Sequence, residues 1–140
     1  MGKLKGNSAI IIGESSGIGR ATAYALAEEG CSLIITARRE ERLKEVAEEC
    51  RKKGVQAHYV VGDASLEETA AACVELCVKQ FGKVDIMINN VGIGKVKPLI
   101  ESTMEDYDQI MNANCRSMFA FSKHAVMDMV KRDDGIVVMV

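Results

Sequence analysis

Tryptophan is absent from this 140-residue chain, proline occurs once, and tyrosine and phenylalanine occur three times each. So few aromatic rings leave little for stacking nucleic-acid bases, and a net charge of −2 offers no basic surface to phosphate backbones. We therefore expect neither nucleic acid nor a membrane among its partners. The apolar runs are too short to span a bilayer, and residues 1–6 lack the apolar core of a secretory signal, so we expect a cytoplasmic protein.

Histidine is also scarce, with two residues, and the five cysteines stand at positions 31, 50, 73, 77 and 115. An odd and scattered set of cysteines indicates reduced thiols rather than disulfides. Cys73 and Cys77 have the spacing of half a metal site, but no second pair of ligands accompanies them. We expect both to be structural and the chain to bind no metal.

The sequence does contain a regular alternation of short apolar runs and longer amphipathic segments. The apolar runs predict strands over residues 9–12, 32–36, 56–61, 84–89 and 136–140. The amphipathic segments predict helices over 17–29, 40–53, 66–81 and 103–131. The last of these is long enough that we expect a bend or a short break in it.

A helix separates each predicted strand from the next, which is typical of a parallel sheet. The strands are apolar throughout rather than alternating, so helices should cover both faces of the sheet. The predicted fold class is therefore α/β: one Rossmann-type domain over residues 1–140, with a doubly wound parallel sheet in the order 3-2-1-4-5. Ligands of such sheets bind beyond the carboxyl ends of the strands, where the winding reverses.

The segment GESSGIG, residues 13–19, lies between the first predicted strand and the first predicted helix. Glycines let the backbone approach phosphates closely, and a helix N-terminus presents free N–H groups to a pyrophosphate. A tight turn without a ligand is the alternative. We favour a nucleotide site because the strand–turn–helix context is the one that such sites require. Its residues would be Gly13, Ser15, Ser16, Gly17, Ile18 and Gly19.

With this spacing the chain resembles the short-chain dehydrogenase/reductase family. GESSGIG is similar to the family's TGxxxGIG loop, and NNVG at 89–92 is similar to its NNAG segment. Asp63 and Asn114 stand where the family has an aspartate that touches adenine and a helix asparagine. The four landmarks follow in order over essentially the whole chain. The resemblance implies a catalytic role for Asn114 and cofactor contacts from Asp63, Ala64, Asn90, Val91 and Gly92.

The chain departs from the family pattern at two positions. Ile12 replaces a threonine whose hydroxyl ties the first strand to the Asn-Asn turn, so that tie should be lost. Glu14 replaces a small residue, and a carboxylate close to phosphates weakens binding unless it points to solvent.

The end of the second predicted strand indicates which nicotinamide cofactor is bound. An acidic residue there would bind the ribose 2′-hydroxyl of NAD, but the position is Ala37, followed by Arg38 and Arg39. A guanidinium group suits the 2′-phosphate of NADP. The alternative is that both arginines are solvated or pair with Glu40 and Glu41. We favour the phosphate, chiefly through Arg38, and predict NADP(H).

The resemblance further implies carbonyl reduction or alcohol oxidation by hydride transfer, with a serine and a Tyr-x-x-x-Lys pair that follow the fifth strand. No tyrosine of this chain has a lysine four residues later, and the chain ends at Val140. We therefore expect the cofactor-binding half of an NADP-dependent oxidoreductase for a small-molecule carbonyl or alcohol, truncated after the fifth strand. A non-catalytic NADP-binding or interaction module is the alternative. The uncovered edge strand and long helix predict a homo-oligomer.

Overall fold

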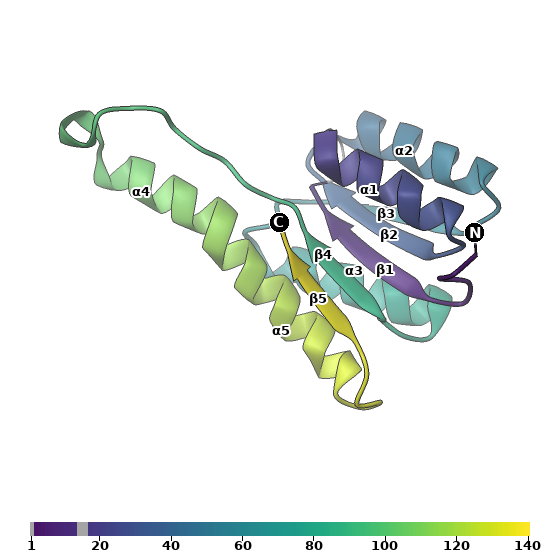
Figure 1. The fold of residues 1–140 in the computed structure, drawn as a ribbon. Coiled ribbons are helices and arrows are strands. Elements are labelled where there is room, and N and C mark those ends of the chain that lie inside the picture. Colours follow the sequence, from purple (N-terminus) through teal and green to yellow (C-terminus); the bar gives the residue numbers. More distant parts are fainter. Residues whose placement is uncertain (1, 14–16) are drawn as a thin grey trace.

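The structure, a computed structural model, describes residues 2–13 and 17–140. Its centre is a parallel five-stranded sheet in the order β3-β2-β1-β4-β5 (Figure 1), which confirms the predicted α/β class and strand order. The strands are β1 (Ser8–Ile12), β2 (Ser32–Ala37), β3 (Ala57–Val61), β4 (Ile86–Asn89) and β5 (Ile136–Met139). The helices are α1 (Gly17–Glu28), α2 (Glu40–Lys52), α3 (Glu67–Phe81), α4 (Met104–Met111) and α5 (Ser117–Met129), with a 3₁₀ helix η1 (Leu99–Glu101) and a π-helix η2 (Asn112–Arg116).

Helices α1 and α2 cover one face of the sheet, and α3 and α5 cover the other (Figure 1). Successive residues of a strand point to opposite faces, so β1 contributes to both cores. Ile11 packs in the core that contains Leu43 of α2, whereas Ile10 packs in the core that contains Phe121 of α5. All five residues of β1 are buried, which explains why Ala9–Ile12 is apolar without alternation.

The predicted helix over residues 103–131 is divided, as its length suggested. It begins with a capping box, in which the backbone N–H of Asp106 donates to Thr103 Oγ1 (3.1 Å) and the backbone N–H of Thr103 donates to Asp106 Oδ2 (3.0 Å). The π-helix η2 then separates α4 from α5. Single π turns inside helices are frequent at functional sites, because they redirect side chains and backbone groups.

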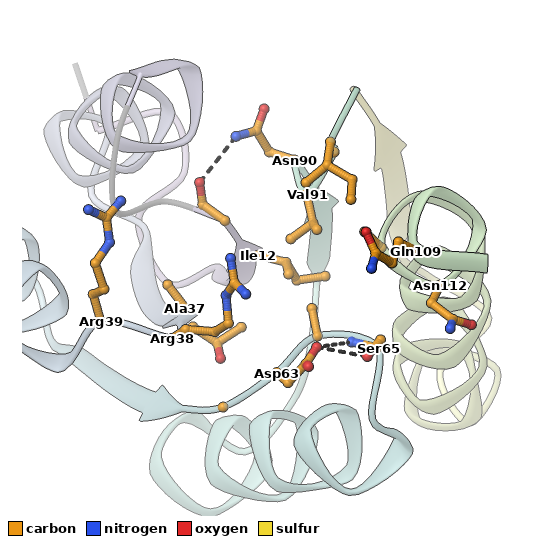
Figure 2. A pocket seen from close by; sticks show the side chains of 17 residues that line it. Ile12, Ala37, Arg38, Arg39, Asp63, Ser65, Asn90, Val91, Gln109 and Asn112 are labelled. Carbon is orange, nitrogen blue, oxygen red and sulfur yellow. Dashed lines mark hydrogen bonds between the residues drawn. The ribbon is translucent and has the colours of Figure 1, made fainter. Parts of the chain in front are cut away.

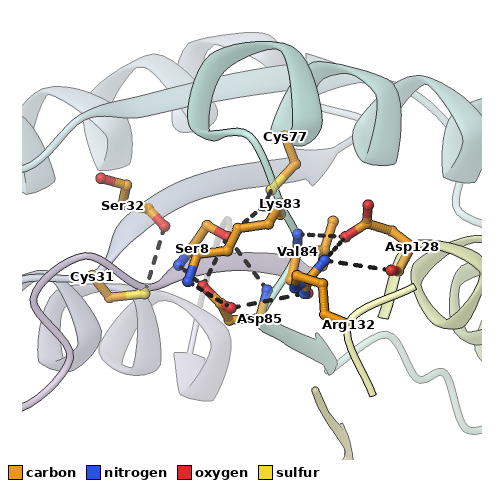
Figure 3. Close-up of polar contacts among 9 residues, drawn as sticks. All are labelled: Ser8, Cys31, Ser32, Cys77, Lys83, Val84, Asp85, Asp128 and Arg132. Carbon is orange, nitrogen blue, oxygen red and sulfur yellow. Dashed lines mark hydrogen bonds and ion pairs between the residues drawn. The ribbon is translucent and has the colours of Figure 1, made fainter. Parts of the chain in front are cut away.

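The strand β4 begins two residues later than predicted, because Val84 and Asp85 take part in a polar network instead (Figure 3). Asp85 Oδ2 accepts from the backbone N–H of Ser8 (2.9 Å), and Asp128 Oδ2 accepts from that of Val84 (2.9 Å) and from Arg132 (2.5 Å). Burial opposes ionisation of Asp128, but the hydrogen bonds from Val84 and Arg132 outweigh it and lower the pKa of its carboxyl. The network joins the start of β4 to β1 and to the end of α5.

Four of the five cysteines are buried and one, Cys115, is exposed. Burial raises the pKa of the Cys31 and Cys77 thiols to about 12, so both are protonated at neutral pH. Within residues 2–13 and 17–140, no three histidine, cysteine, aspartate or glutamate side chains gather as metal ligands. Over the same residues, every helix is too short or too polar to cross a membrane.

Candidate functional site

A cavity of about 580 Å³ lies where the carboxyl ends of β1, β2, β3 and β4 meet. This is the place where the strand order reverses, between β1 and β4. Eight residues predicted from the sequence line it: Gly13, Arg38, Arg39, Asp63, Ala64, Asn90, Val91 and Gly92. They come from four separate segments of the chain and surround one space (Figure 2).

Gly13 makes a close crossing between the ends of β1 and β4. Its φ angle is +78°, and a Cβ atom there would lie 2.9 Å from the backbone oxygen of Asn90. The side-chain amide of Asn90 donates to the Gly13 carbonyl (3.3 Å), and its backbone N–H donates to the Ile12 carbonyl (3.1 Å). These two bonds join β1 to the Asn-Asn turn without the threonine hydroxyl that position 12 lacks.

The remaining residues of the glycine-rich segment do not line the cavity as far as the structure describes them. Gly17 begins α1, Ile18 is 64% exposed and Gly19 is buried within the helix. The predicted contacts of Ser15 and Ser16, and the orientation of Glu14, fall outside the described residues.

Two guanidinium groups stand on the side of the cavity formed by the end of β2. Figure 2 shows Arg38 reaching toward the middle of the space and Arg39 lying farther along the rim. Among the described residues, neither arginine forms an ion pair with Glu40 or Glu41; Glu40 instead pairs with Lys44 at 3.6 Å. Ala37 places no acid at the strand end. The cavity therefore has two cationic side chains at the end of β2, and the charge of Arg38 acts on the carboxylate of Asp63, which lines the same cavity.

Asp63 is the acidic residue among the described residues that line the cavity, and it follows β3, the strand next to β2. Its Oδ1 atom accepts hydrogen bonds from the backbone N–H (2.9 Å) and the hydroxyl (2.8 Å) of Ser65. These bonds, the backbone one first, lower the pKa of Asp63, and the charge of Arg38 adds to the effect. The carboxylate is therefore ionised at neutral pH and fixed in orientation, while Oδ2 accepts neither of these two bonds.

Asn114, in the π-helix, does not line the cavity but holds its wall. Its Oδ1 atom accepts from the backbone N–H of Ile93 (2.7 Å), and its Nδ2 atom donates to the carbonyl of the same residue (2.9 Å). Both polar ends of the side chain are thus used to fix Ile93, which lines the cavity. A nearby bond from Ser117 Oγ to the Ala113 carbonyl (2.6 Å) supports the same π turn.

Sequence reasoning missed the contribution of the helix that follows β4. Gln109, Asn112 and Ala113 line the cavity, and Lys95 donates both to Gln109 Oε1 (2.5 Å) and to Asp106 Oδ1 (2.7 Å). The side chains of Lys95 and Lys97 hold the pKa of Asp106 far below its usual range. These helix residues could have been predicted, because ligands of such sheets bind where the strand order reverses and the connection after the fourth strand borders that place.

Other lining residues sit next to predicted ones in the sequence, and they are Ile12, Thr36, Ala37, Gly62, Ser65 and Ile93. Their places follow from those of the predicted residues, because a strand end brings its neighbours in sequence to the same edge of the sheet.

Comparison with known proteins shows what this chain is similar to. A family model described as short chain dehydrogenase matches residues 7–140. The A-factor type gamma-butyrolactone 1′-reductase (1S-forming) of Streptomyces virginiae is 41% identical over 120 residues, which are 84% of this chain and 46% of that protein. The 7alpha-hydroxysteroid dehydrogenase of Clostridium sardiniense is 36% identical over 99% of this chain and 54% of its own length.

Solved structures agree with these relatives. The crystal structure of an NAD+-bound xylitol dehydrogenase superposes with a TM-score of 0.93 and 30% sequence identity, covering 98% of this chain and 53% of that one. The chain thus spans about half the length of the proteins it matches.

Proposed function

The chain belongs to the short chain dehydrogenase family, and from this membership we propose that it forms the dinucleotide-binding half of an NADP-dependent oxidoreductase. The substrate of the whole enzyme would be a small-molecule carbonyl or alcohol. The observation that carries the proposal is the cavity that gathers Gly13, Arg38, Asp63 and Asn90 from four strand ends. When bound, the nicotinamide ring of such a cofactor supplies or accepts a hydride.

The described residues suit a nicotinamide dinucleotide. The missing Cβ at Gly13 lets the end of β1 cross close to the Asn90 backbone, and the start of α1 follows in the chain, where N–H groups favour a diphosphate. In this proposal Gly13, Ser15, Ser16, Gly17, Ile18 and Gly19 hold the diphosphate. Asp63 and Ala64 border the adenine, and Asn90, Val91 and Gly92 border the adjoining ribose. Asn114 keeps Ile93 and the π turn in place and contributes to proton transfer.

Arg38 and the lack of an acid at position 37 support NADP over NAD. A 2′-phosphate would add a dianion beside two guanidinium groups, whereas the bare 2′-hydroxyl of NAD offers them no charge to pair with. Asp63, which follows the neighbouring strand β3, feels the charge of Arg38, but its Oδ1 atom already accepts two hydrogen bonds from Ser65.

Titration calorimetry of the chain with NADPH and NADH tests the preference. We expect NADPH to bind at least about tenfold more tightly, because a charge-assisted bond to phosphate contributes about 1.5–3 kcal/mol. Arg38→Ala should weaken NADPH binding and leave NADH binding nearly unchanged. Arg42→Ala is the matched control, since Arg42 is an exposed arginine of the next helix and lies outside the cavity wall. Tighter binding of NADH by the unmodified chain would contradict the proposal.

A second candidate is a non-catalytic NADP-binding module, because the described lining of the cavity contains neither a tyrosine nor a lysine. The two candidates differ when the catalytic half of a homologous enzyme is supplied as a separate polypeptide. Oxidation of NADPH by a carbonyl compound in that mixture supports the oxidoreductase. Binding of NADPH without turnover in the same mixture supports the module.

We also propose that copies of the chain associate through the long helix. Apolar side chains are exposed along it, among them Met104 (73%), Phe119 (73%) and Val130 (67%). So many large apolar side chains on one element are typical of a surface that another protein covers.

A further inference from the structure

Arg116, the last residue of the π-helix, reaches across to the turn that follows β3. Its Nε atom donates to the carbonyl oxygen of Ser65 at 3.1 Å, although the two residues are 51 positions apart in the sequence. Arg116 is exposed, so this contact is not a by-product of core packing. Resting on the proposed function, we propose that Arg116 is a positioning residue that sets recognition of the adenine base by fixing the turn that carries Asp63.

The connection runs from Arg116 through Ser65 to Asp63. The carbonyl of Ser65 accepts from Arg116, while its backbone N–H and hydroxyl both donate to Asp63 Oδ1. The turn is closed locally by the backbone N–H of Leu66, which donates to the Asp63 carbonyl at 3.1 Å. Ser65 therefore carries bonds on both sides, and a shift of its peptide unit changes the orientation of the Asp63 carboxylate.

Arg116 acts on this carboxylate through geometry rather than through its charge. The groups that lower the pKa of Asp63 are the Ser65 donors and, more weakly, Arg38. Asp63 and Ser65 line the cavity, but Arg116 does not. Loss of its Nε donor should therefore loosen the turn and leave the electrostatic field of the cavity largely unchanged.

The chemistry of adenine gives this inference a specific readout. The 6-amino group of adenine donates to a carboxylate, whereas hypoxanthine has a carbonyl oxygen in the same place, which a carboxylate repels. The ratio of the dissociation constants for the hypoxanthine and adenine forms of reduced NADP therefore measures how well Asp63 faces the base. A hydrogen bond to a charged group makes a ratio of about ten or more reasonable for the unmodified chain.

The experiment measures both dissociation constants for the unmodified chain, Arg116→Gln, Arg116→Lys and Arg116→Met. We expect Arg116→Gln and Arg116→Met to lower the ratio at least about threefold, chiefly through weaker binding of the adenine form. Arg116→Lys keeps a donor and should lie between them and the unmodified chain. Lys123→Gln is the matched control, since Lys123 makes a comparable contact, from α5 to Glu67 at the start of α3 (2.9 Å), but touches neither Ser65 nor Asp63.

The outcomes separate this inference from the proposed function. An unchanged ratio in whichever of Arg116→Gln and Arg116→Met folds, as judged by circular dichroism, overturns the role of Arg116 and leaves dinucleotide binding intact. An equal fall of the ratio in Lys123→Gln also overturns it, because the effect would then belong to helix packing in general. Failure of the unmodified, folded chain to bind either nucleotide overturns the proposed function and this inference with it.

Discussion

Gly13→Ala tests the close crossing of β1 and β4 on which the cavity depends. An alanine at a φ of +78° costs about 1–2 kcal/mol in backbone conformation. Its Cβ would also lie 2.9 Å from the Asn90 carbonyl oxygen and 3.1 Å from Val91 Cγ2, so the end of β4 must move. Overpacking of this kind adds about 1–3 kcal/mol. We expect the free energy of unfolding to fall by about 2–5 kcal/mol in total.

Gly54→Ala separates the two contributions. Gly54 has a φ of +89° and no atom within 4 Å of a built Cβ, so it carries the conformational cost without the contact. Alanine also lowers the conformational entropy of the unfolded chain, but by a similar amount at both sites, so this effect cancels when the two variants are compared. Urea denaturation followed by circular dichroism should show Gly13→Ala less stable than Gly54→Ala by about 1–3 kcal/mol. Equal stability of the two variants would refute the reasoning, since it would mean that Asn90 moves away from the new Cβ atom without any loss of folding free energy.

Three further predictions follow from other parts of the molecule. The lowered pKa of Asp128 stabilises the fold above the unfolded value of 3.8, and this contribution is lost as the pH falls through the folded value. Between pH 5 and pH 3, the free energy of unfolding measured by urea denaturation should therefore fall less for Asp128→Asn than for the unmodified chain. An equal fall in both proteins would contradict the network described above. Phe119→Glu should shift the chain toward monomer in sedimentation velocity; an unchanged distribution would place association elsewhere. The chain alone should bind NADPH without oxidising it in the presence of a ketone, and a steady fall of absorbance at about 340 nm, the nicotinamide band of the reduced cofactor, would show that its residues suffice for hydride transfer.

The sequence was sufficient to predict the sheet and eight of the 17 residues that line the cavity, because both depend on local patterns. Apolar runs without alternation predicted buried parallel strands, and the turns after those strands contain Gly13, Arg38, Asp63 and Asn90. A parallel sheet brings the carboxyl ends of all its strands to one edge, so residues at these turns meet without further information.

The contacts that the sequence could not predict are those that side chains make with groups from other segments of the chain. The bond from Arg116 to Ser65 and the two bonds from Asn114 to Ile93 depend on where a π turn falls in the long helix. A bend was predictable from helix length, but its register was not, because the apolar spacing is compatible with several positions. The bonds of Lys95 to Asp106 and Gln109 depend in the same way on the path of a loop whose sequence has no periodicity.

The π turn also determines which changes of length the gene can tolerate. Each residue of a regular helix advances the rotation by about 100°, so deletion of one residue between Asn112 and Arg116 would turn α5 by that angle relative to α4. Either Phe121 would then no longer pack in the core, or Asn114 would lose its hydrogen bonds to the backbone of Ile93. A single-codon deletion at these five positions should therefore be far more damaging than one at the exposed residues 133 and 134, which connect α5 to β5.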